Sequence, residues 1–420
     1  MRRLARIVIN WEWLFLLLLL PILLFPTGWR GLVLLIIPLL WILRKFAIGH
    51  FVPPTPFDTT VLVMMATILI SLAAVFDINL SFPKIAGLIL GIAYFYGGVQ
   101  HARQNHEGEY HLLSLIFIAG TGMALVGFLS IISITSFADI AAVPSTALSN
   151  ILGRTVNPNE LAGVLGWLLP LLLASTIGFW RPMWRSGHWW PRLLHLILVA
   201  MLLFNAVVLL ATRSRGGVLS ICVALIVMLA VRFRWGRWLL LVIVTASIAL
   251  GFYLDLGAFL LGDTQTAADL GLQGRLEIWS RALYGLADFP LTGMSMNGFR
   301  QIVHVLYPLF TIALDFDLGH AHNHLLQAGL DLGIIGLIAY LGIWILSLTL
   351  LWIGWRNSRR HSDRVLIVGL SGSLTAGWVF GILDAIALGA RPGFLWWLLL
   401  ALLVTVFDSV RRLQSQGNAR

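Results

Sequence analysis

The stretch LLHLILVAMLLFNAVVLLATRSRGGVLSICVALIVMLAVR, residues 193–232, contains two apolar runs separated by ATRSRGG, residues 211–217. Each run has about the length of a helix that crosses the roughly 30 Å of hydrocarbon in a bilayer. The stretch therefore predicts two transmembrane helices joined by a tight turn. Arg213 and Arg215 would lie at the edge of the membrane, and the side that this edge faces decides what they can bind.

The same pattern extends along the whole chain. Of its 420 residues, 59% are hydrophobic and 11% are charged, and the mean hydropathy is +0.91. A soluble core cannot bury so much apolar surface, so the composition predicts an all-α polytopic integral membrane protein. The single cysteine, Cys222, excludes an internal disulfide. The basic start predicts an uncleaved first helix, because no A-x-A-like site follows it.

Twelve apolar runs have the length and composition of transmembrane helices. They are expected near 11–26, 28–43, 58–76, 84–99, 111–136, 160–180, 193–211, 216–232, 238–260, 331–355, 365–388 and 393–409. Two connections are long, 137–159 and 261–330, and the second lies between the ninth and tenth spans.

An even number of spans places both termini on one side of the membrane. With both termini in the cytoplasm, 19 of the 28 lysines and arginines fall in inner segments, as the positive-inside rule predicts. The net charge of +10 then reflects cytoplasmic loops and not nucleic-acid binding. Both long connections and ATRSRGG become external. The outer arginines oppose the bias, and an anionic ligand at the outer surface is the simplest reason for them.

Two external stretches precede the long loop. In GRTVNPNELAGVL, residues 153–165, Asn157-Pro158-Asn159 is typical of a turn, and Asn159-Glu160 could cap the following helix. That stretch is as typical of a plain loop as of an anion site. In ATRSRGG, Gly216-Gly217 would let a bulky group approach the backbone. The alternative for both arginines is snorkelling of long side chains to the interface.

The long loop contributes QGRLEIWSRALYGLADFPLTG, residues 273–293. Its pattern predicts a helix from Leu276 to Leu286, with Arg275 at the start and Trp279 one turn later. Arg275 either pairs with Glu277 or Asp288 on a surface helix or binds a ligand. The ligand is favoured, because an arginine at a helix N-terminus opposes the helix dipole.

The fourth stretch is GHAHNHLLQAGLDLGIIG, residues 319–336, with three histidines at alternate positions. On a helix, His320 and His324 would share a face, while His322 would point away. We expect no metal here, because zinc needs a third protein ligand and no HExxH or cysteine pair is present. A histidine beside an Asn-capped helix start is a better general base, which Asn323 could orient.

Together, in this order and on one face, these stretches resemble the O-antigen ligase and polymerase superfamily of bacterial envelope glycosyltransferases. The matching pieces are NPN-x-LA (157–162), SRGG (214–217), GR-x-x-x-W (274–279), P-L-x-G (290–293) and H-x-HN-x-x-L-Q (320–327). The resemblance covers about 155–340. It departs from the family after the proline, where Gly293-Met294-Ser295 stands in place of a frequent Gly-x-Gly.

The resemblance implies a glycan donor on a polyisoprenyl (undecaprenyl) diphosphate and an inverting transfer without metal or cofactor. Arg215 and Arg275 match the family's diphosphate-binding arginines, and His322 matches its catalytic histidine. Further substrate-binding positions would be Arg213, Asn157, Asn159, Trp279, His320 and Asn323, with Trp279 stacking on a sugar or anchoring at the interface. Residues 137–340 would be the catalytic region, between transmembrane helices in 1–136 and 341–420. The site would face outward from the bacterial cytoplasmic membrane.

The acceptor is the open question at this stage. The expected twelve-span layout with one dominant external loop favours a ligase that transfers to lipid A-core, whereas a polymerase would extend the glycan on the lipid carrier. A transporter of the same lipid would place polar residues at mid-membrane. Here the unusual polar residues lie at the external edges, which favours an enzyme.

Overall fold

The computed structural model describes residues 28–132, 156–253, 272–313, 316–386 and 388–418, with single positions between residues 5 and 16. Within these ranges every regular element is a helix, and eight helices are long and apolar enough to cross a membrane. The all-α polytopic class is confirmed. Twelve spans and cytoplasmic termini stay predictions. Most of the expected span 11–26, most of the connection 137–159 and the part of the long loop before Leu272 lie outside the described residues.

The chain divides into two compact units, each made of three segments. Unit 1 consists of Met1–Tyr94, Arg232–Leu346 and Gly381–Phe394, and unit 2 of Phe95–Val231, Ser347–Phe380 and Leu395–Arg420. Five helices contain residues of both units: α5 (Ile78–Gln104), α10 (Arg215–Arg232), α15 (His324–Asn357), α16 (His361–Leu383) and α17 (Phe394–Asn418).

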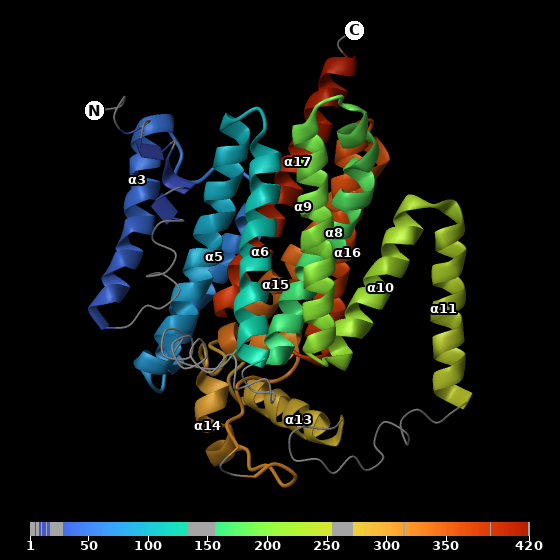
Figure 1. Cartoon of the computed structure of the whole chain (residues 1–420). Helices are drawn as coiled ribbons and strands as arrows, with labels where there is room; N and C mark the ends of the chain where they lie inside the picture. Colours follow the sequence, from blue (N-terminus) through green and yellow to red (C-terminus); the bar gives the residue numbers. More distant parts are fainter. Residues whose placement is uncertain are drawn as a thin grey trace. The chain divides into compact units, whose positions relative to one another are not determined.

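Unit 2 has three consecutive helices that pack side by side: α6 (Gly108–Ile132), α8 (Pro158–Arg185) and α9 (Trp189–Ala211) (Figure 1). Small residues let α6 and α8 approach closely. A Cβ on Gly127 would lie 2.5 Å from the Leu161 side chain, which is closer than packed atoms tolerate. The next helix, α10 (Arg215–Arg232), begins directly after the turn that carries Arg213.

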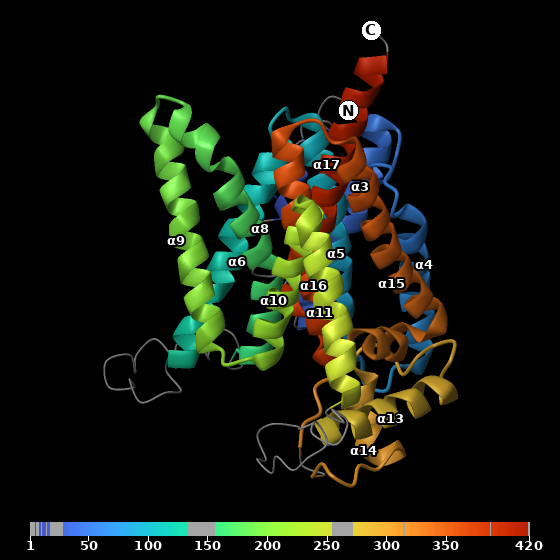
Figure 2. The same cartoon turned by 90° about the vertical axis from the view of Figure 1, so that its right-hand side faces the viewer.

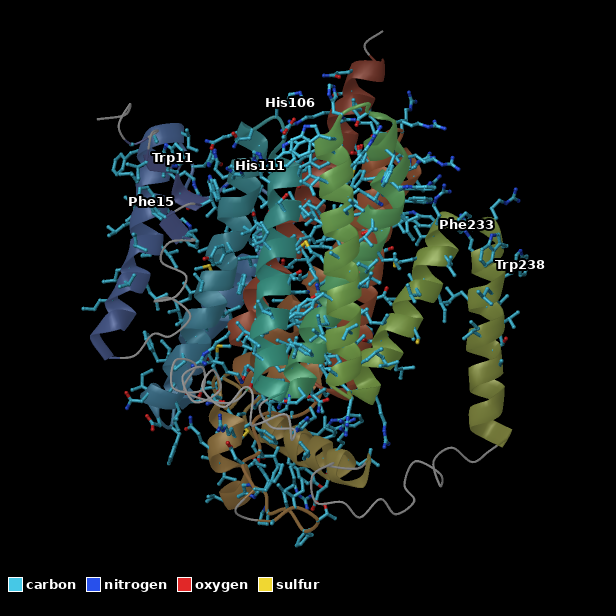
Figure 3. All side chains as sticks on the ribbon, in the orientation of Figure 1. Trp11, Phe15, His106, His111, Phe233 and Trp238 are labelled. Atoms are coloured by element: carbon cyan, nitrogen blue, oxygen red, sulfur yellow. The ribbon has the colours of Figure 1, made fainter. Side chains whose placement is uncertain are left out.

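Unit 1 contains the remaining elements. They are η1 (Gly28–Leu35), α3 (Ile36–Ile48), α4 (Asp58–Ser71), η2 (Leu72–Ala74), α11 (Arg234–Tyr253), α13 (Leu272–Asp288), α14 (Gly298–Leu306) and η3 (Arg391–Gly393). Phe233 and Trp238 lie at the start of α11 (Figure 3), and the Arg232 guanidinium lies 5.0 Å from the Phe233 ring centroid. Aromatic and basic residues together are typical of a membrane–water interface.

The described part of the predicted external loop, the external segment of unit 1, shares an apolar core with the start of α15. Helices α13 and α14, the chain up to Ala321, and Leu330 contribute to it (Figure 2), with Ile278, Phe299 and Leu318 almost fully buried. The sequence predicted the helix from Leu276 to Leu286, and the structure extends it by four residues at the start and two at the end.

Helix α15 is interrupted at Gly333, whose backbone is non-helical (φ 73°, ψ −178°). The turn that follows Pro290 fills the break. The Ile334 N–H donates to the Pro290 carbonyl at 2.8 Å, and the Met294 N–H donates to the Leu330 carbonyl at 2.7 Å. A Cβ on Gly333 would lie 2.3 Å from the Leu291 carbonyl oxygen, so only glycine fits there. The first part of α15, His324–Leu332, is thus a separate short helix held by the external segment.

The same turn contains Ser295, which stands where the family often has the second glycine of Gly-x-Gly. Ser295 has φ 66°, in the left-handed region that glycine adopts at least cost. The backbone at this position is therefore left-handed although the residue is not glycine.

Candidate active site

Asn323 caps the first short helix of α15. Its side-chain oxygen accepts hydrogen bonds from the backbone N–H groups of Leu325 at 3.0 Å and Leu326 at 3.1 Å. The predicted Asn cap is present. The Asn323 amide donates to the Ile382 carbonyl at 3.3 Å. These contacts direct Asn323 toward the backbone, so a different residue orients the neighbouring histidine.

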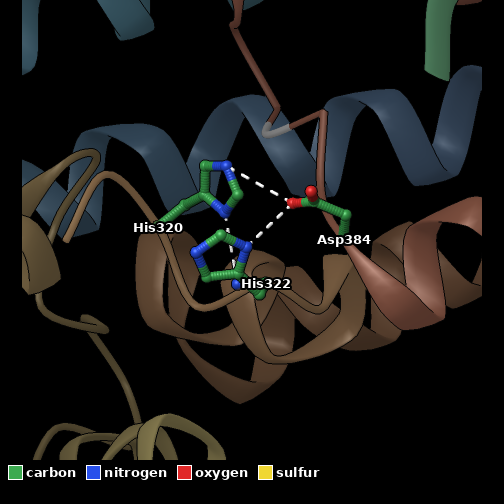
Figure 4. Close-up of side chains that lie close together, drawn as sticks. All are labelled: His320, His322 and Asp384. Atoms are coloured by element: carbon green, nitrogen blue, oxygen red, sulfur yellow. Dashed lines mark hydrogen bonds and ion pairs between the residues drawn. The ribbon is translucent and has the colours of Figure 1, made fainter. Parts of the chain in front are cut away.

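That residue is Asp384, which follows the last turn of α16. The His322 Nδ1 lies 3.0 Å from the Asp384 Oδ1 (Figure 4). Because a carboxylate only accepts, His322 donates through Nδ1–H, and its Nε2 keeps a lone pair. The backbone of His322 is left-handed, with φ 48°. Such a conformation costs free energy and is concentrated at functional sites.

Asp384 is held from two directions. Its Oδ1 also accepts the Ala385 N–H at 2.8 Å. Burial raises the pKa of the Asp384 carboxyl, but the hydrogen bond from His322, the nearby imidazoles of His320 and His322 and the Ala385 N–H together outweigh it, and the net shift lies below the ordinary value. The carboxylate is therefore ionised at neutral pH.

His320 is the neutral neighbour of this pair. Its Nδ1 accepts the His322 backbone N–H at 3.2 Å, and its Nε2 lies 3.6 Å from the Asp384 Oδ1. Burial, followed by the nearby His322, lowers the pKa of His320 to about 3. A neutral imidazole with Nδ1 as acceptor carries its proton on Nε2. His320 is thus a fixed hydrogen-bonding group with no free nitrogen lone pair to act as a base.

His324 belongs to a different environment. Its Nδ1 lies 2.8 Å from the Tyr340 hydroxyl, and its ring packs edge-on against Trp344. The expectation that His320 and His324 share a helix face was wrong, because the helix begins only at His324. In the non-helical segment before it, His320 and His322 turn toward the same carboxylate (Figure 4).

The sequence argument against a metal counted two usable histidines, and Asp384 adds a third potential ligand. One ligand atom each from His320, His322 and Asp384 lies within 4.8 Å of the others. Two histidines and a carboxylate suit several divalent metals. In the structure His322 donates to Asp384, and His320 accepts the His322 backbone N–H. Chelation distinguishes a metal role from a proton-transfer role for these groups.

Arg275 lies in the first turn of α13, as predicted. The two carboxylates that could neutralise it are engaged elsewhere. Glu277 accepts the backbone N–H groups of Phe310 and Thr311, and Asp288 accepts the Tyr307 hydroxyl at 2.6 Å. Within the described part of the chain, the Arg275 Nε is buried and has no hydrogen-bond partner. Neither carboxylate that the sequence offered as its partner is paired with it.

Trp279 lies one turn after Arg275 and is partly buried. It packs against the apolar core of the external segment. Its indole Nε1 is buried and has no hydrogen-bond partner among the described residues. A buried indole N–H usually has a partner, so this donor is an exception.

Arg213 and Arg215 lie in unit 2, and both side chains are exposed. Arg213 has left-handed backbone, φ 53°, in a turn held by its hydroxyl neighbours. The Ser214 N–H donates to the Thr212 hydroxyl at 3.3 Å, and the Gly217 N–H donates to the Ser214 hydroxyl at 3.2 Å. Ser214 thus caps α10, and Arg215 is its first residue.

The stretch 153–165 and the stretch ATRSRGG, residues 211–217, meet at Gly217. A Cβ on Gly217 would lie 2.7 Å from the Ala162 Cβ in the first turns of α8. The prediction that this glycine leaves room for a ligand was wrong, because a neighbouring helix fills the space. Asn157, not Asn159, caps α8, since the Asn157 side-chain oxygen accepts the Asn159 N–H at 2.9 Å.

Comparison with known proteins assigns a family to the central region. Residues 198–341 match the family model described as O-antigen ligase. This region belongs to the O-antigen ligase and polymerase superfamily. The match contains Arg213, Arg215, Arg275, Trp279, His320, His322 and Asn323, and supports a membrane enzyme of the ligase or polymerase type. No curated protein matches the chain.

Asp384 lies outside the O-antigen ligase match, and the sequence analysis did not select it. One signal was available: Asp384 is an acidic residue within the apolar run 365–388. An ionisable residue in a predicted span is a functional candidate by default. Its partner 62 positions earlier could not be identified from spacing alone.

Proposed function

We propose that this protein transfers a glycan from a polyisoprenyl (undecaprenyl) diphosphate to an acceptor hydroxyl at the outer face of the bacterial cytoplasmic membrane. The observation that carries the proposal is the His322–Asp384 pair, which leaves His322 Nε2 as a base. The family match to an O-antigen ligase supplies the class of reaction. The acceptor is lipid A-core, which makes the enzyme a ligase of lipopolysaccharide biosynthesis. The expected twelve-span layout with one dominant external loop favours this over a polymerase.

The chemistry follows from the tautomer. The acceptor hydroxyl gives its proton to His322 Nε2 as its oxygen bonds to the anomeric carbon of the donor sugar. The bond between that carbon and the phosphate oxygen breaks, and the lipid diphosphate leaves with the electron pair. Attack from the face opposite the diphosphate inverts the anomeric centre. Asp384 stabilises the imidazolium that forms at His322.

The leaving diphosphate needs positive charge, which arginines supply without a metal ion. Arg275 is available because its neighbouring carboxylates are occupied, and Arg215 is exposed at the start of α10. A guanidinium contacts two phosphate oxygens at once and stabilises the charge that develops on them. Arg213, Asn157 and Asn159 contribute further donors, and Trp279 stacks on a sugar of the donor.

Reconstitution tests the function directly. In liposomes with undecaprenyl-diphosphate oligosaccharide and lipid A-core, we expect glycosylated lipid A-core and free lipid diphosphate, at equal rates with and without EDTA. Elongated lipid-linked glycan as the sole product would identify a polymerase, and lipid movement without transfer would identify a transporter. Loss of activity in EDTA, restored by Zn²⁺ or Mn²⁺, would assign His320, His322 and Asp384 to a metal.

Replacing Arg215 with lysine tests the diphosphate contact. Lysine keeps the charge but loses the fork of donors, so Arg215→Lys should lower kcat by about 10²–10³-fold, nearly as far as Arg215→Ala. Arg275→Lys should behave in the same way. Arg213→Lys, on the same turn, is the matched control and should be milder. Full transfer by Arg215→Lys at equal expression would indicate simple snorkelling at the interface.

A further inference from the structure

A buried polar chain leads from α5 to the residue before His322. It starts at Lys84, whose Nζ lies 3.4 Å from both carboxylate oxygens of Asp331. The Asp331 side chain is fully buried. A buried carboxylate without a cation is strongly destabilising, so Lys84 is the group that makes this position of Asp331 tolerable.

Gln327 continues the chain toward the active site. Its amide nitrogen donates to the Asp331 Oδ1 at 2.8 Å, and its amide oxygen accepts the Ala321 N–H at 2.8 Å. Gln327 and Asp331 are one helical turn apart, before the break at Gly333. The chain of hydrogen bonds therefore ends on the backbone N–H of Ala321, the residue before His322.

The main chain of Lys84 contacts the segment that follows Asp384, the partner of His322. A Cβ on Gly389 would lie 1.9 Å from the Lys84 carbonyl oxygen, and a Cβ on Gly87 would lie 2.1 Å from the Gly389 carbonyl oxygen. Gly389 belongs to the connection that starts at Asp384 and leads to η3. One residue of α5 thus touches both segments: its side chain contacts Asp331, and its backbone abuts the connection from Asp384.

We propose that Lys84, Asp331 and Gln327 are positioning residues that align His322 with Asp384, an inference that rests on the proposed function. His322 has a strained left-handed backbone and needs such support. Proton transfer depends on placement, and an error of about 1 Å can lower a rate about 10²-fold. None of the three residues has to touch the substrate for this role.

The test uses full-length protein in liposomes with lipid-linked donor and lipid A-core. Gln327→Met and Lys84→Met should each lower kcat by about 10–100-fold, with donor KM changed less than about threefold. Lys84→Arg should recover most of the loss, because it restores the cation beside Asp331. The matched control is Lys45→Met, the same change at the chain's other lysine, and it should be near wild type.

A double variant separates positioning from folding. If Gln327 acts through His322, adding Gln327→Met to His322→Ala should change the residual rate less than about threefold. A full further loss in that background would show a general structural role and overturn the inference. Wild-type kcat in Gln327→Met and Lys84→Met, with His322→Ala inactive, would overturn the inference alone. An active His322→Ala enzyme would instead remove the proposed function.

Discussion

The His322→Ala enzyme is expected to bind the lipid-linked donor and to transfer about 10²–10⁴-fold more slowly than wild type. The base is lost, whereas the arginines that hold the diphosphate are unchanged. The measurement is donor binding together with single-turnover transfer.

The neighbouring histidines provide matched controls. Because its pKa is lowered to about 3, His320 stays neutral at every pH at which transfer is measured. His320→Ala should therefore lose activity only through the hydrogen bond from the His322 backbone N–H, an intermediate effect at most. His324→Ala should be mild, because His324 contacts Tyr340 and not Asp384. Equal loss in all three variants would indicate a shared metal site or a folding defect, and a near-wild-type His322→Ala enzyme would end the general-base proposal.

The helices were predictable because each has a local cause. Apolar runs of membrane-spanning length gave α6, α8, α9, α10 and α16 within a few residues. The break at Gly333 was not predictable in the same way. In the apolar run 331–355, nothing in the sequence distinguishes Gly333 from a glycine inside a continuous span. The helix is interrupted there because the carbonyl groups of Pro290 and Leu291 occupy the gap.

The candidate site was predictable in its separate parts and not in its assembly. Arg275 and Asn323 lie at helix starts as the sequence predicted, because caps and helix entries are encoded within a few residues. The residues that hold His322 in place are not encoded near it in the sequence. Asp384 and Lys84 lie outside the stretches that resemble the family, and Lys84 meets Asp331 across 247 positions. Such contacts depend on how the helices pack, which local patterns do not encode.

Replacing Asp384 should have the second largest effect on transfer, because Asp384 determines the tautomer of His322. A carboxylate can only accept, which fixes the proton on Nδ1 and leaves Nε2 basic. An asparagine can turn its NH₂ toward His322 and select the opposite tautomer, which cannot take a proton at Nε2. Because the pKa of Asp384 is lowered, its charge and the stability it contributes are present at neutral pH and are lost only as pH falls below the ordinary carboxyl value.

Asp384→Asn should therefore lower kcat by about 10²–10⁴-fold while donor binding stays within about threefold of wild type. Single-turnover transfer and donor binding measure the two effects separately. Asp317→Asn is the matched control, because it removes an exposed carboxylate of the same unit that pairs with Arg300, and it should transfer normally. Combined with His322→Ala, Asp384→Asn should add little, since both changes disable the same base. Normal transfer by Asp384→Asn, beside an inactive His322→Ala, would show that another group orients the histidine.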